Sequence, residues 1–304
     1  MEKLVSAIIT THNRKKLLER AIESVFAQTY KNIELIVVDD HSTDGTCDIC
    51  QDSRIKYIYI PKEESRGGNY ARNLGIKNSR GEYCAFLDDD DFWKPEKIEK
   101  QLKLIREKKC SMVFCLREKE YVKNGKVIKI GHEYPYKPSG DISQEIFKHY
   151  ITNTSCILAE KEKLYQIGLF DENLRKWQEY DLMIRMSERT NIYYVEEYLC
   201  VYRNDYTDKN RVSNDFDRVI ETTGKIREKY RDRLAALPIK TKLYFCDTCI
   251  GDIYSLACQA NKRKYKYLLF VPYYILMVFK FFDDRNFATR YMQILQRKLH
   301  LKRS

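Results

Sequence analysis

The chain has 304 residues, which is enough for one large domain with an appendage or for two domains. Its formal net charge of +11 is uneven, because residues 262–304 hold eleven Lys or Arg against two Asp and the rest of the chain is nearly neutral. This pattern excludes a uniformly cationic protein and predicts a basic end that binds an anionic surface.

The first residues lead directly into a strand-like stretch and lack the apolar core of a signal peptide, which predicts cytosolic synthesis and residence. The ten cysteines are then expected to be reduced thiols that pack as small apolar side chains. Two pairs, Cys47/Cys50 and Cys246/Cys249, have the spacing of zinc ligands. Both pairs lie in helix-like sequence without turn-forming residues, so we favour free thiols over a zinc site.

Strand and helix signals alternate through the first half of the chain, which is typical of a mostly parallel α/β sheet. Asn13 is expected to cap the first helix, whose apolar residues recur on one face as far as Phe26. The further expected elements are strands 5–10, 33–38, 55–60 and 83–87, a short helix ending at 50, and helix 69–78.

The second half is expected to be mixed. Pro95 opens a helix through Lys108, and strand 111–116 follows. Asn124-Gly125 predicts a two-residue hairpin, at which the regular alternation ends. Strand 154–158 and helices 160–166 and 179–188 come next, and the sequence is mainly helical after Tyr202. We therefore expect a catalytic domain over 1–205, with helices flanking a mixed, mostly parallel sheet, and a helical, basic region over 206–304.

Two groups of carboxylates follow two of the expected strands, Asp39-Asp40 after 33–38 and the run 88–91 after 83–87. Ligands of open α/β sheets bind beyond the carboxyl ends of the strands, so both groups should face one crevice. The run of four Asp could be a solvated loop, but apolar residues on both sides hold it close to the core. Because clustered carboxylates repel one another, we expect a Mn²⁺ or Mg²⁺ site, which would stabilise a departing nucleotide diphosphate.

The chain resembles the family 2 glycosyltransferases, which have the A-type glycosyltransferase fold. The matching stretches are residues 6–14, 36–46, 67–75, 81–91, 167–172 and 178–185. They occur in order and at plausible spacing over about residues 4 to 203, which makes the resemblance more specific than any single motif.

The resemblance implies roles for individual residues. The residues implied for the nucleotide sugar are Thr11, Asn13, Arg14, Asp40, Arg72, Asp88 and Asp89, and those implied for the metal are Asp90 and Asp91. Asp40 would hydrogen-bond the base, most often uracil in this family, so a UDP-sugar donor is expected. Asp88 would approach the ribose while Asp90 holds the metal, although four consecutive Asp residues leave this register open by one position.

Inversion at the anomeric carbon requires a base that removes the proton of the acceptor hydroxyl. Glu179 stands where the family usually carries its catalytic Asp, and Asp181 follows two residues later, so either carboxylate is a candidate. A structural role for Glu179 is the alternative, in which it caps a helix and pairs with Arg175 or Arg185. Trp177 is a candidate for stacking on the acceptor sugar.

Residues 268–282 are apolar except for Lys280 and are flanked by basic segments. The stretch is short for a spanning helix, which needs about 20 apolar residues, so we expect an interfacial anchor on an anionic membrane. This predicts a cytoplasmic protein that is peripheral on the inner face of the cell membrane. Packing in a core or in a homo-oligomer contact is the alternative.

We therefore expect an inverting glycosyltransferase that uses a saccharide or lipid-linked saccharide acceptor in cell-surface polysaccharide synthesis. A non-catalytic scaffold that binds nucleotide sugars is the alternative. A nucleotidyltransferase would carry a glycine-rich basic loop after its first strand, where this chain has Thr11-His12-Asn13-Arg14. Nucleic acid is not an expected partner, because the basic end interleaves aromatic and aliphatic residues and contains no recognised reader motif.

Overall fold

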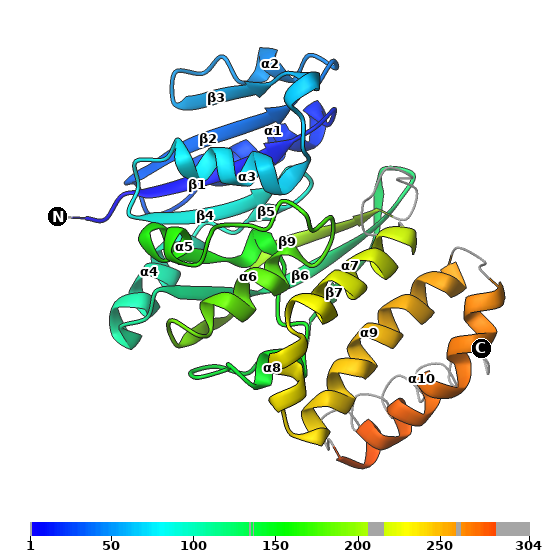
Figure 1. The fold of residues 1–304 in the computed structure, drawn as a ribbon. Helices are drawn as coiled ribbons and strands as arrows, with labels where there is room; N and C mark the ends of the chain where they lie inside the picture. Colours follow the sequence, from blue (N-terminus) through cyan, green and yellow to red (C-terminus); the bar gives the residue numbers. More distant parts are fainter. Residues whose placement is uncertain (1, 134, 136, 206–215, 260–262, 284–304) are drawn as a thin grey trace. The chain divides into compact units, whose positions relative to one another are not determined.

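The computed structural model describes residues 2–133, 135, 137–205, 216–259 and 263–283 (Figure 1). The chain forms two compact units, one made of residues 1–146 and 151–213 and the other of residues 147–150 and 214–304. The domain boundary predicted after residue 205 adjoins 206–215, which lie outside the described residues, so that boundary stays a prediction.

The first unit is built on a mixed sheet. In the described residues the sheet has nine strands, in the order β3-β2-β1-β4-β8-β6-β9-β5, and β7 pairs with β6. The strands are β1 (Val5–Thr11), β2 (Ile33–Asp40), β3 (Ile55–Ile60), β4 (Tyr83–Asp88), β5 (Phe92–Trp93), β6 (Met112–Lys123), β7 (Lys126–His132), β8 (Leu158–Glu160) and β9 (Ile192–Asp205). The first four are parallel, β8 is antiparallel to both β4 and β6, and β9 is parallel to β6. The expected mixed, mostly parallel sheet is confirmed.

Helices flank this sheet, as expected. They are α1 (Lys15–Phe26), α2 (Thr46–Ile49), α3 (Gly68–Lys77), α4 (Lys97–Lys108), α5 (Lys161–Gln166) and α6 (Gln178–Met186), with 3-10 turns η1 (Lys62–Glu64), η2 (Glu145–Phe147) and η3 (Thr154–Cys156). In Figure 1, α3 crosses the sheet over β1 and β2, which it contacts. The central strands are buried on both faces, and so they are apolar throughout their length and lack the alternation of a half-exposed strand.

The predicted hairpin is confirmed between β6 and β7, where Asn124 and Gly125 have φ angles of 51° and 76°. Positive φ at both central positions is the requirement of a type I′ turn, and Asn-Gly meets it at little cost.

Three expectations about local structure were wrong or incomplete. Asn13 does not cap α1; the first amide of the helix, that of Lys15, donates instead to the carboxylate of Asp44 at 2.9 Å. In place of the strand expected over 154–158, the chain forms the turn η3 followed by the short strand β8. In the turn, the buried hydroxyl of Ser155 reaches its hydrogen-bond partner Asp91. The strand β9 was not predicted at all, and it extends to Asp205.

The second unit is helical in its described part, as expected for the C-terminal region. Its helices are α7 (Phe216–Lys229), α8 (Arg231–Ala236), α9 (Ile239–Gln259) and α10 (Arg263–Asp283). Phe216 and Val219 of α7 pack with Leu256 and Ala257 of α9. The rings of Tyr254 and Tyr273 stack at 4.7 Å between α9 and α10. Within the described ranges, no helix is both long and apolar enough to cross a membrane.

Candidate active site

The carboxyl ends of three neighbouring parallel strands form one edge of the sheet. In register, Thr11 at the end of β1 lies beside Asp39 of β2, and Thr10 lies beside Asp88 of β4. Parallel strands bring their carboxyl ends to the same side, so the two acidic groups meet as the sequence predicted. This edge therefore holds most of the residues implied for the nucleotide sugar.

The loops after β1 and β2 are fastened to each other through Asn13. Its side-chain oxygen accepts a hydrogen bond from the amide of Thr43 at 2.7 Å, and its own amide donates to the hydroxyl of Ser42 at 2.8 Å. Asn13 has a φ of 52°, in the left-handed region that Asn tolerates better than most residues. The contacts leave Asn13 without the capping role expected for it, but they shape the loop that carries Asp40 and His41.

The two acidic residues that end β2 have different surroundings. Asp39 is buried and accepts hydrogen bonds from the amide of Ser42 at 2.9 Å and from the hydroxyl of Tyr57 at 2.7 Å. Asp40 lies at the edge itself, with its carboxylate 3.2 Å from Nδ1 of His41. Asp39 thus supports the loop, while Asp40 lies where it could contact the nucleobase of a bound nucleotide.

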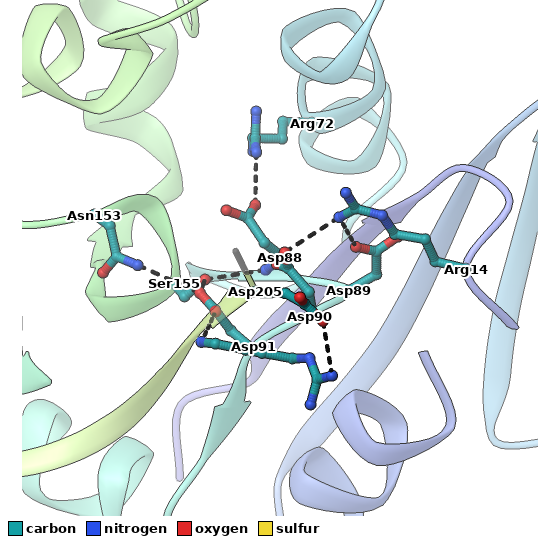
Figure 2. A network of polar contacts seen from close by, with 10 residues as sticks. Arg14, Arg72, Asp88, Asp89, Asp90, Asp91, Asn153, Ser155 and Asp205 are labelled. Carbon is teal, nitrogen blue, oxygen red and sulfur yellow. Dashed lines mark hydrogen bonds and ion pairs between the residues drawn. The ribbon is translucent and has the colours of Figure 1, made fainter. Parts of the chain in front are cut away.

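Two arginines reach the run of four Asp residues from different directions (Figure 2). Nη1 of Arg14 donates to Asp89 at 3.1 Å and to Asp90 at 3.2 Å. Nη2 of Arg72, on α3, donates to Asp88 at 2.6 Å. Arginines that are bonded to carboxylates at a strand end can turn toward the phosphates of a nucleotide, because a phosphate accepts the same charge-assisted hydrogen bonds.

The four Asp side chains differ in how they are exposed. Asp89 and Asp91 are buried, whereas the side chains of Asp88 and Asp90 keep 29% and 14% of their surface accessible. Burial and the neighbouring charge of Asp90 raise the pKa of Asp89 to about 7, although Arg14 opposes the rise. Asp88, at the end of β4, and Asp90, in the turn that follows, are thus the more accessible pair, which we call the outward pair.

Asp91 is tied into the protein by three donors. Its Oδ2 accepts from the hydroxyl of Ser155 at 2.6 Å and from the amide of Asn153 at 3.3 Å, and its Oδ1 accepts from the backbone amide of Arg203 at 3.1 Å (Figure 2). Burial and the charges of Asp90 and Asp88 raise its pKa well above the usual range. Asp91 thus links β4 to the turn η3 and to β9.

The predicted base, Glu179, is the second residue of α6 and is buried. Thr154 of η3 donates to its carboxylate at 3.5 Å. Burial, together with the charge of Asp88, raises the pKa of Glu179 to about 7, while Arg72 and Arg117 oppose the rise. The charges of Asp88 and Arg72 thus both act on this carboxylate, and a pKa near 7 suits a general base.

The second candidate base, Asp181, has a different environment. It is fully buried, and Arg185 donates to its Oδ2 through two nitrogens, at 3.0 and 2.5 Å. Arg185 also donates to the carbonyl of Ile167 at 2.5 Å. Asp181 thereby holds α6 to the segment before it, and Arg185 is paired with Asp181.

Trp177 precedes α6 in the left-handed region, with a φ of 57°, which is rare for a bulky residue and costs of the order of 1 kcal/mol or more. Its ring is buried and meets the ring of Tyr180 edge-on, with centroids 5.6 Å apart. This backbone turn fixes where α6 begins, and so it positions Glu179. The stacking on an acceptor sugar that was expected of Trp177 stays a prediction.

Comparison with known proteins places this geometry in a family. The model of the family "Glycosyl transferase family 2" matches residues 6–168, which is more than half of the chain. The chain belongs to glycosyl transferase family 2. The resemblance seen in the sequence is thereby confirmed.

Known proteins that are similar to this chain differ in how much of it they match. An uncharacterized glycosyltransferase of Rickettsia typhi is 36% identical over 199 residues, which are 64% of this chain and 62% of that protein. The protein WfaP of Escherichia coli, a UDP-Glc:alpha-D-GlcNAc-diphosphoundecaprenol beta-1,3-glucosyltransferase, is 45% identical over 109 residues, 35% of this chain and 43% of that protein. The chain thus spans less than two thirds of the length of these relatives.

The fold is that of solved glycosyltransferases. The mannosyltransferase PcManGT of Pyrobaculum calidifontis, solved with GDP-Man and Mn²⁺, superposes with a TM-score of 0.61 at 16% identity, over 92% of this chain and 87% of that one. At this level of identity the likeness establishes the A-type glycosyltransferase fold, which was the expected one.

The carboxylates at this site of the family 2 chain fit a divalent cation whose remaining coordination positions are filled by the substrate. Among the described residues, no group of three or more His, Cys, Asp or Glu side chains converges as a ready metal site. Mg²⁺ is commonly held by one or two carboxylates together with substrate phosphates, and so a complete protein cage is not needed. The donor set here is carboxylate oxygen, and burial together with the charge of Asp90 raises the pKa of Asp89 even though Arg14 lies beside it.

Several polar residues that hold the site together were missed from the sequence. Asn69 of α3 donates to the carbonyls of Asp171 and Leu174 at 2.9 and 2.7 Å, and Asn73 donates to the carbonyl of Phe170 at 2.9 Å. These amides tie α3, which carries Arg72, to the loop that leads into α6. Asn69 and Asn73 lie one turn apart on a helix, a spacing that could have marked them as a polar stripe facing protein.

The buried polar run 152–155 was also missed. Besides the contacts of Asn153 and Ser155 with Asp91, the hydroxyl of Ser155 accepts from the amide of Asp88 at 3.1 Å. Its carbonyl accepts from the indole of Trp93 at 2.8 Å. Four consecutive small polar residues between apolar ones were the available signal, since polar groups that enter a core need specific partners.

Proposed function

We propose that this chain is a metal-dependent inverting glycosyltransferase. It moves a sugar, a hexose or an N-acetylhexosamine, from a UDP-sugar to a saccharide or lipid-linked saccharide acceptor in the synthesis of a cell-surface polysaccharide. The observation that carries the proposal is the accessible pair Asp88 and Asp90, which lies beside Arg14 and Arg72. The charge of Asp88 also acts on the buried Glu179. Membership of family 2 and the activity that the name of WfaP states support the same reaction class.

The residues divide the reaction between donor and acceptor. Thr11, Asn13 and Asp40 form the nucleoside side, while Arg14 and Arg72 turn toward the diphosphate when a donor binds. Asp90, with Asp88 beside it, would hold Mn²⁺ or Mg²⁺, which stabilises the negative charge of the departing diphosphate when it is bound. The alternation of exposure along the run supports Asp88 and Asp90, and not Asp89 and Asp91, as the pair that faces the ligand.

Glu179 is the proposed base. Its carboxylate takes the proton of the acceptor hydroxyl while the hydroxyl oxygen forms a bond to the anomeric carbon and the bond from that carbon to the diphosphate oxygen breaks. The products are the glycosylated acceptor with inverted configuration and the nucleoside diphosphate. The engagement of Asp181 by Arg185 supports Glu179 over Asp181 in this role, because the Asp181 carboxylate is fully buried and already accepts two hydrogen bonds from the guanidinium.

The experiment that tests the proposal is a donor screen. Purified full-length chain is incubated with Mn²⁺ or Mg²⁺ and a panel of nucleotide sugars, with and without saccharide and lipid-linked acceptors, and released nucleoside diphosphate is measured. We expect metal-dependent release from one donor, which identifies the sugar, and loss of release in Asp90→Ala. Nucleotide-sugar binding without release under every condition would overturn the proposal in favour of a non-catalytic scaffold.

We also propose a place for the protein, peripheral on the inner face of the cell membrane through α10. One face of this helix exposes large apolar side chains, which are Tyr267, Leu268, Val271, Ile275 and Val278. They recur at three- and four-residue spacing, the pattern of an amphipathic helix that lies in a membrane interface. The basic residues around α10 in the sequence would add attraction to anionic lipid.

A further inference from the structure

Strand β6, which contacts the turn η3, carries charges on both of its faces. Its pairing with β9 is regular from Arg117 to Tyr121, so Arg117 and Lys119 lie on one face and Glu118 and Glu120 lie on the other. The two faces can be compared directly, because they belong to the same stretch of strand.

The acidic face is neutralised by the protein itself. Glu118 is 2.7 Å from Nζ of Lys94, and Glu120 accepts two hydrogen bonds of 2.9 Å from the guanidinium of Arg20. Each carboxylate on this face therefore has a cationic partner in the fold.

The basic face is not neutralised in the same way. We call Arg117, Lys119 and Lys137 the cationic cluster; among the described residues, its acidic neighbour in direct contact is Glu133. Oε2 of Glu133 lies 3.0 Å from Nζ of Lys137 and 3.3 Å from Nε of Arg117, the latter without hydrogen-bond geometry. Three cations beside one carboxylate leave an excess of two positive charges.

Lys119 shows this excess most clearly. Within the part of the chain that the structure describes, its ammonium group has no hydrogen bond or ion pair. Burial and the charges of Arg117 and Lys137 lower its pKa to about 8, with only partial compensation by Glu133. A half-buried cation among other cations costs free energy of folding, and a bound anion would offset that cost.

One turn, η3, connects the strand of the cationic cluster to the proposed base. Turn η3 contacts β4, β6 and β9, and its Thr154 donates to Glu179. The charge of Arg117 opposes the rise that burial causes in the pKa of Glu179, and it adds to the hydrogen bonds from Cys115 and Cys200 that lower the pKa of Cys156 in η3. Turn η3 thus contacts both strand β6, which carries Arg117 and Lys119, and the side chain of Glu179 on helix α6, so an acceptor with its hydroxyl at Glu179 could reach the cluster with another group.

We infer that the cationic cluster binds a phosphate group of the acceptor, next to the sugar whose hydroxyl is glycosylated. The inference rests on the proposed function, of which it names the acceptor class. A phosphate offers oxygen acceptors to an arginine fork and to lysine ammonium groups, and its charge opposes the excess of the cluster. The phosphate could belong to a diphosphate that links the acceptor sugar to a lipid, or to a phosphodiester within a polymer.

The test compares Lys119→Gln with a matched control, Lys123→Gln, which changes an exposed lysine further along the same strand. Three synthetic acceptors carry the same sugar and alkyl chain, joined by a neutral glycoside, a phosphodiester or a diphosphate. We expect Lys119→Gln to lower kcat/KM about tenfold for acceptors that carry phosphate, and to leave donor hydrolysis and the neutral acceptor unchanged. The acceptor that shows the larger loss identifies the source of the phosphate.

An equal effect of Lys119→Gln on all three acceptors, or an effect on none, would overturn the inference while leaving the transferase proposal intact. A second measurement does not depend on turnover: titration calorimetry of inorganic phosphate into the full chain saturated with UDP and Mg²⁺. We expect weaker phosphate binding in Lys119→Gln and wild-type binding in Lys123→Gln. If the donor screen fails but this difference is found, the proposed reaction is wrong and the anion site stands; if wild-type chain and Lys119→Gln bind phosphate equally, the site itself is wrong.

Discussion

Arg72 and Asp88 are joined by a hydrogen bond of 2.6 Å between a guanidinium nitrogen and a carboxylate oxygen. Arg72 is almost fully buried, while Asp88 keeps part of its side chain accessible. Helix α3 therefore holds the first carboxylate of the proposed ligand pair through a residue that also donates to Asn69 of its own helix. Arg72 and Asp88 therefore differ in role: Arg72 is held in place by the fold, and the carboxylate of Asp88 is available to a ligand.

Replacing Arg72 by Gln removes the cation expected to contact the diphosphate. We expect kcat/KM for donor hydrolysis to fall about 100-fold, as for loss of a charge-assisted hydrogen bond in a buried setting. Stability should fall by only about 1 kcal/mol, because Asp88 can still be hydrated. Steady-state kinetics and thermal unfolding measure the two effects. Arg80→Gln, which breaks an exposed ion pair with Glu34 away from the site, is the control and should change neither.

Substitution of Asp90 should affect turnover, whereas substitution of Asp91 should affect stability. Asp90→Ala is expected to abolish metal-dependent turnover and to change stability by less than about 1 kcal/mol, because it also removes a charge that repels Asp89. Asp91→Ala leaves the donors Ser155, Asn153 and the amide of Arg203 without their acceptor, and we expect a loss of about 3 kcal/mol. Urea unfolding of both variants decides the matter. Equal destabilisation by the two substitutions would contradict the assignment.

The rate should depend on pH through Glu179. Because burial and Asp88 raise its pKa to about 7, the carboxylate accepts protons below that pH and stops acting as a base. We expect kcat/KM to fall about tenfold per pH unit below 7. Glu179→Asp should have lower activity but the same fall in rate at acidic pH. Glu179→Gln should lose the activity and, with it, the pH dependence. A flat profile of the wild-type enzyme between pH 5.5 and 7 would argue against Glu179 as the base.

The same residue makes a prediction about stability. Its pKa is about 7 in the folded chain and about 4.3 in the unfolded chain, so between these values the folded state binds more protons. Its contribution to stability is therefore full below pH 4.3 and is lost as the pH rises through 7. Glu179→Gln, which stays neutral, should unfold at a higher temperature than wild type at pH 8 and at nearly the same temperature at pH 4.5. This gain in stability combined with loss of activity would distinguish a catalytic carboxylate from a structural one.

The exposed face of α10 should bind anionic membranes. We expect wild-type chain to float with vesicles of mixed anionic and neutral lipid, and less so at high salt, where headgroup charge is screened. Leu268→Glu with Ile275→Glu should lower the partition coefficient by at least 10-fold, since burial of each side chain contributes about 1.5–3 kcal/mol. If the face instead forms a homo-oligomer contact, the double variant will change the mass measured by light scattering and leave flotation unaltered.

The donor edge was predictable because its signals are local. Each central strand is a short apolar run, β2 and β4 end in acidic residues, and the rule for parallel strands then brings Asp39, Asp40 and the 88–91 run to the same side of the sheet. The exposure of alternate residues in that run was not predictable, because four identical side chains give no sequence signal. It follows from which of them meet Arg14, Arg72 and Ser155 in the fold.

The failures share a physical cause, which is dependence on distant partners. Strand β9 contains Glu196 and Glu197 within its length and has no regular alternation, so its pairing with β6 decides its conformation. Asn is a preferred capping residue, yet the side chain of Asn13 accepts a hydrogen bond from the amide of Thr43. The first amide of α1 is bonded instead by Asp44, which lies in another loop. In both cases tertiary contacts outweigh a local preference worth about 1 kcal/mol.

The position of β8 has a consequence for chain synthesis. This short strand fills the space between β4 and β6, yet it is made some 70 residues after β4 ends. A nascent chain that ends at the hairpin contains all of β1 to β4, but β4 would lack its partner β8 and present unpaired backbone amides and carbonyls along one border. Such a border pairs readily with other chains. Fragments that end before residue 158 should therefore aggregate even though they contain every residue of the nucleotide side.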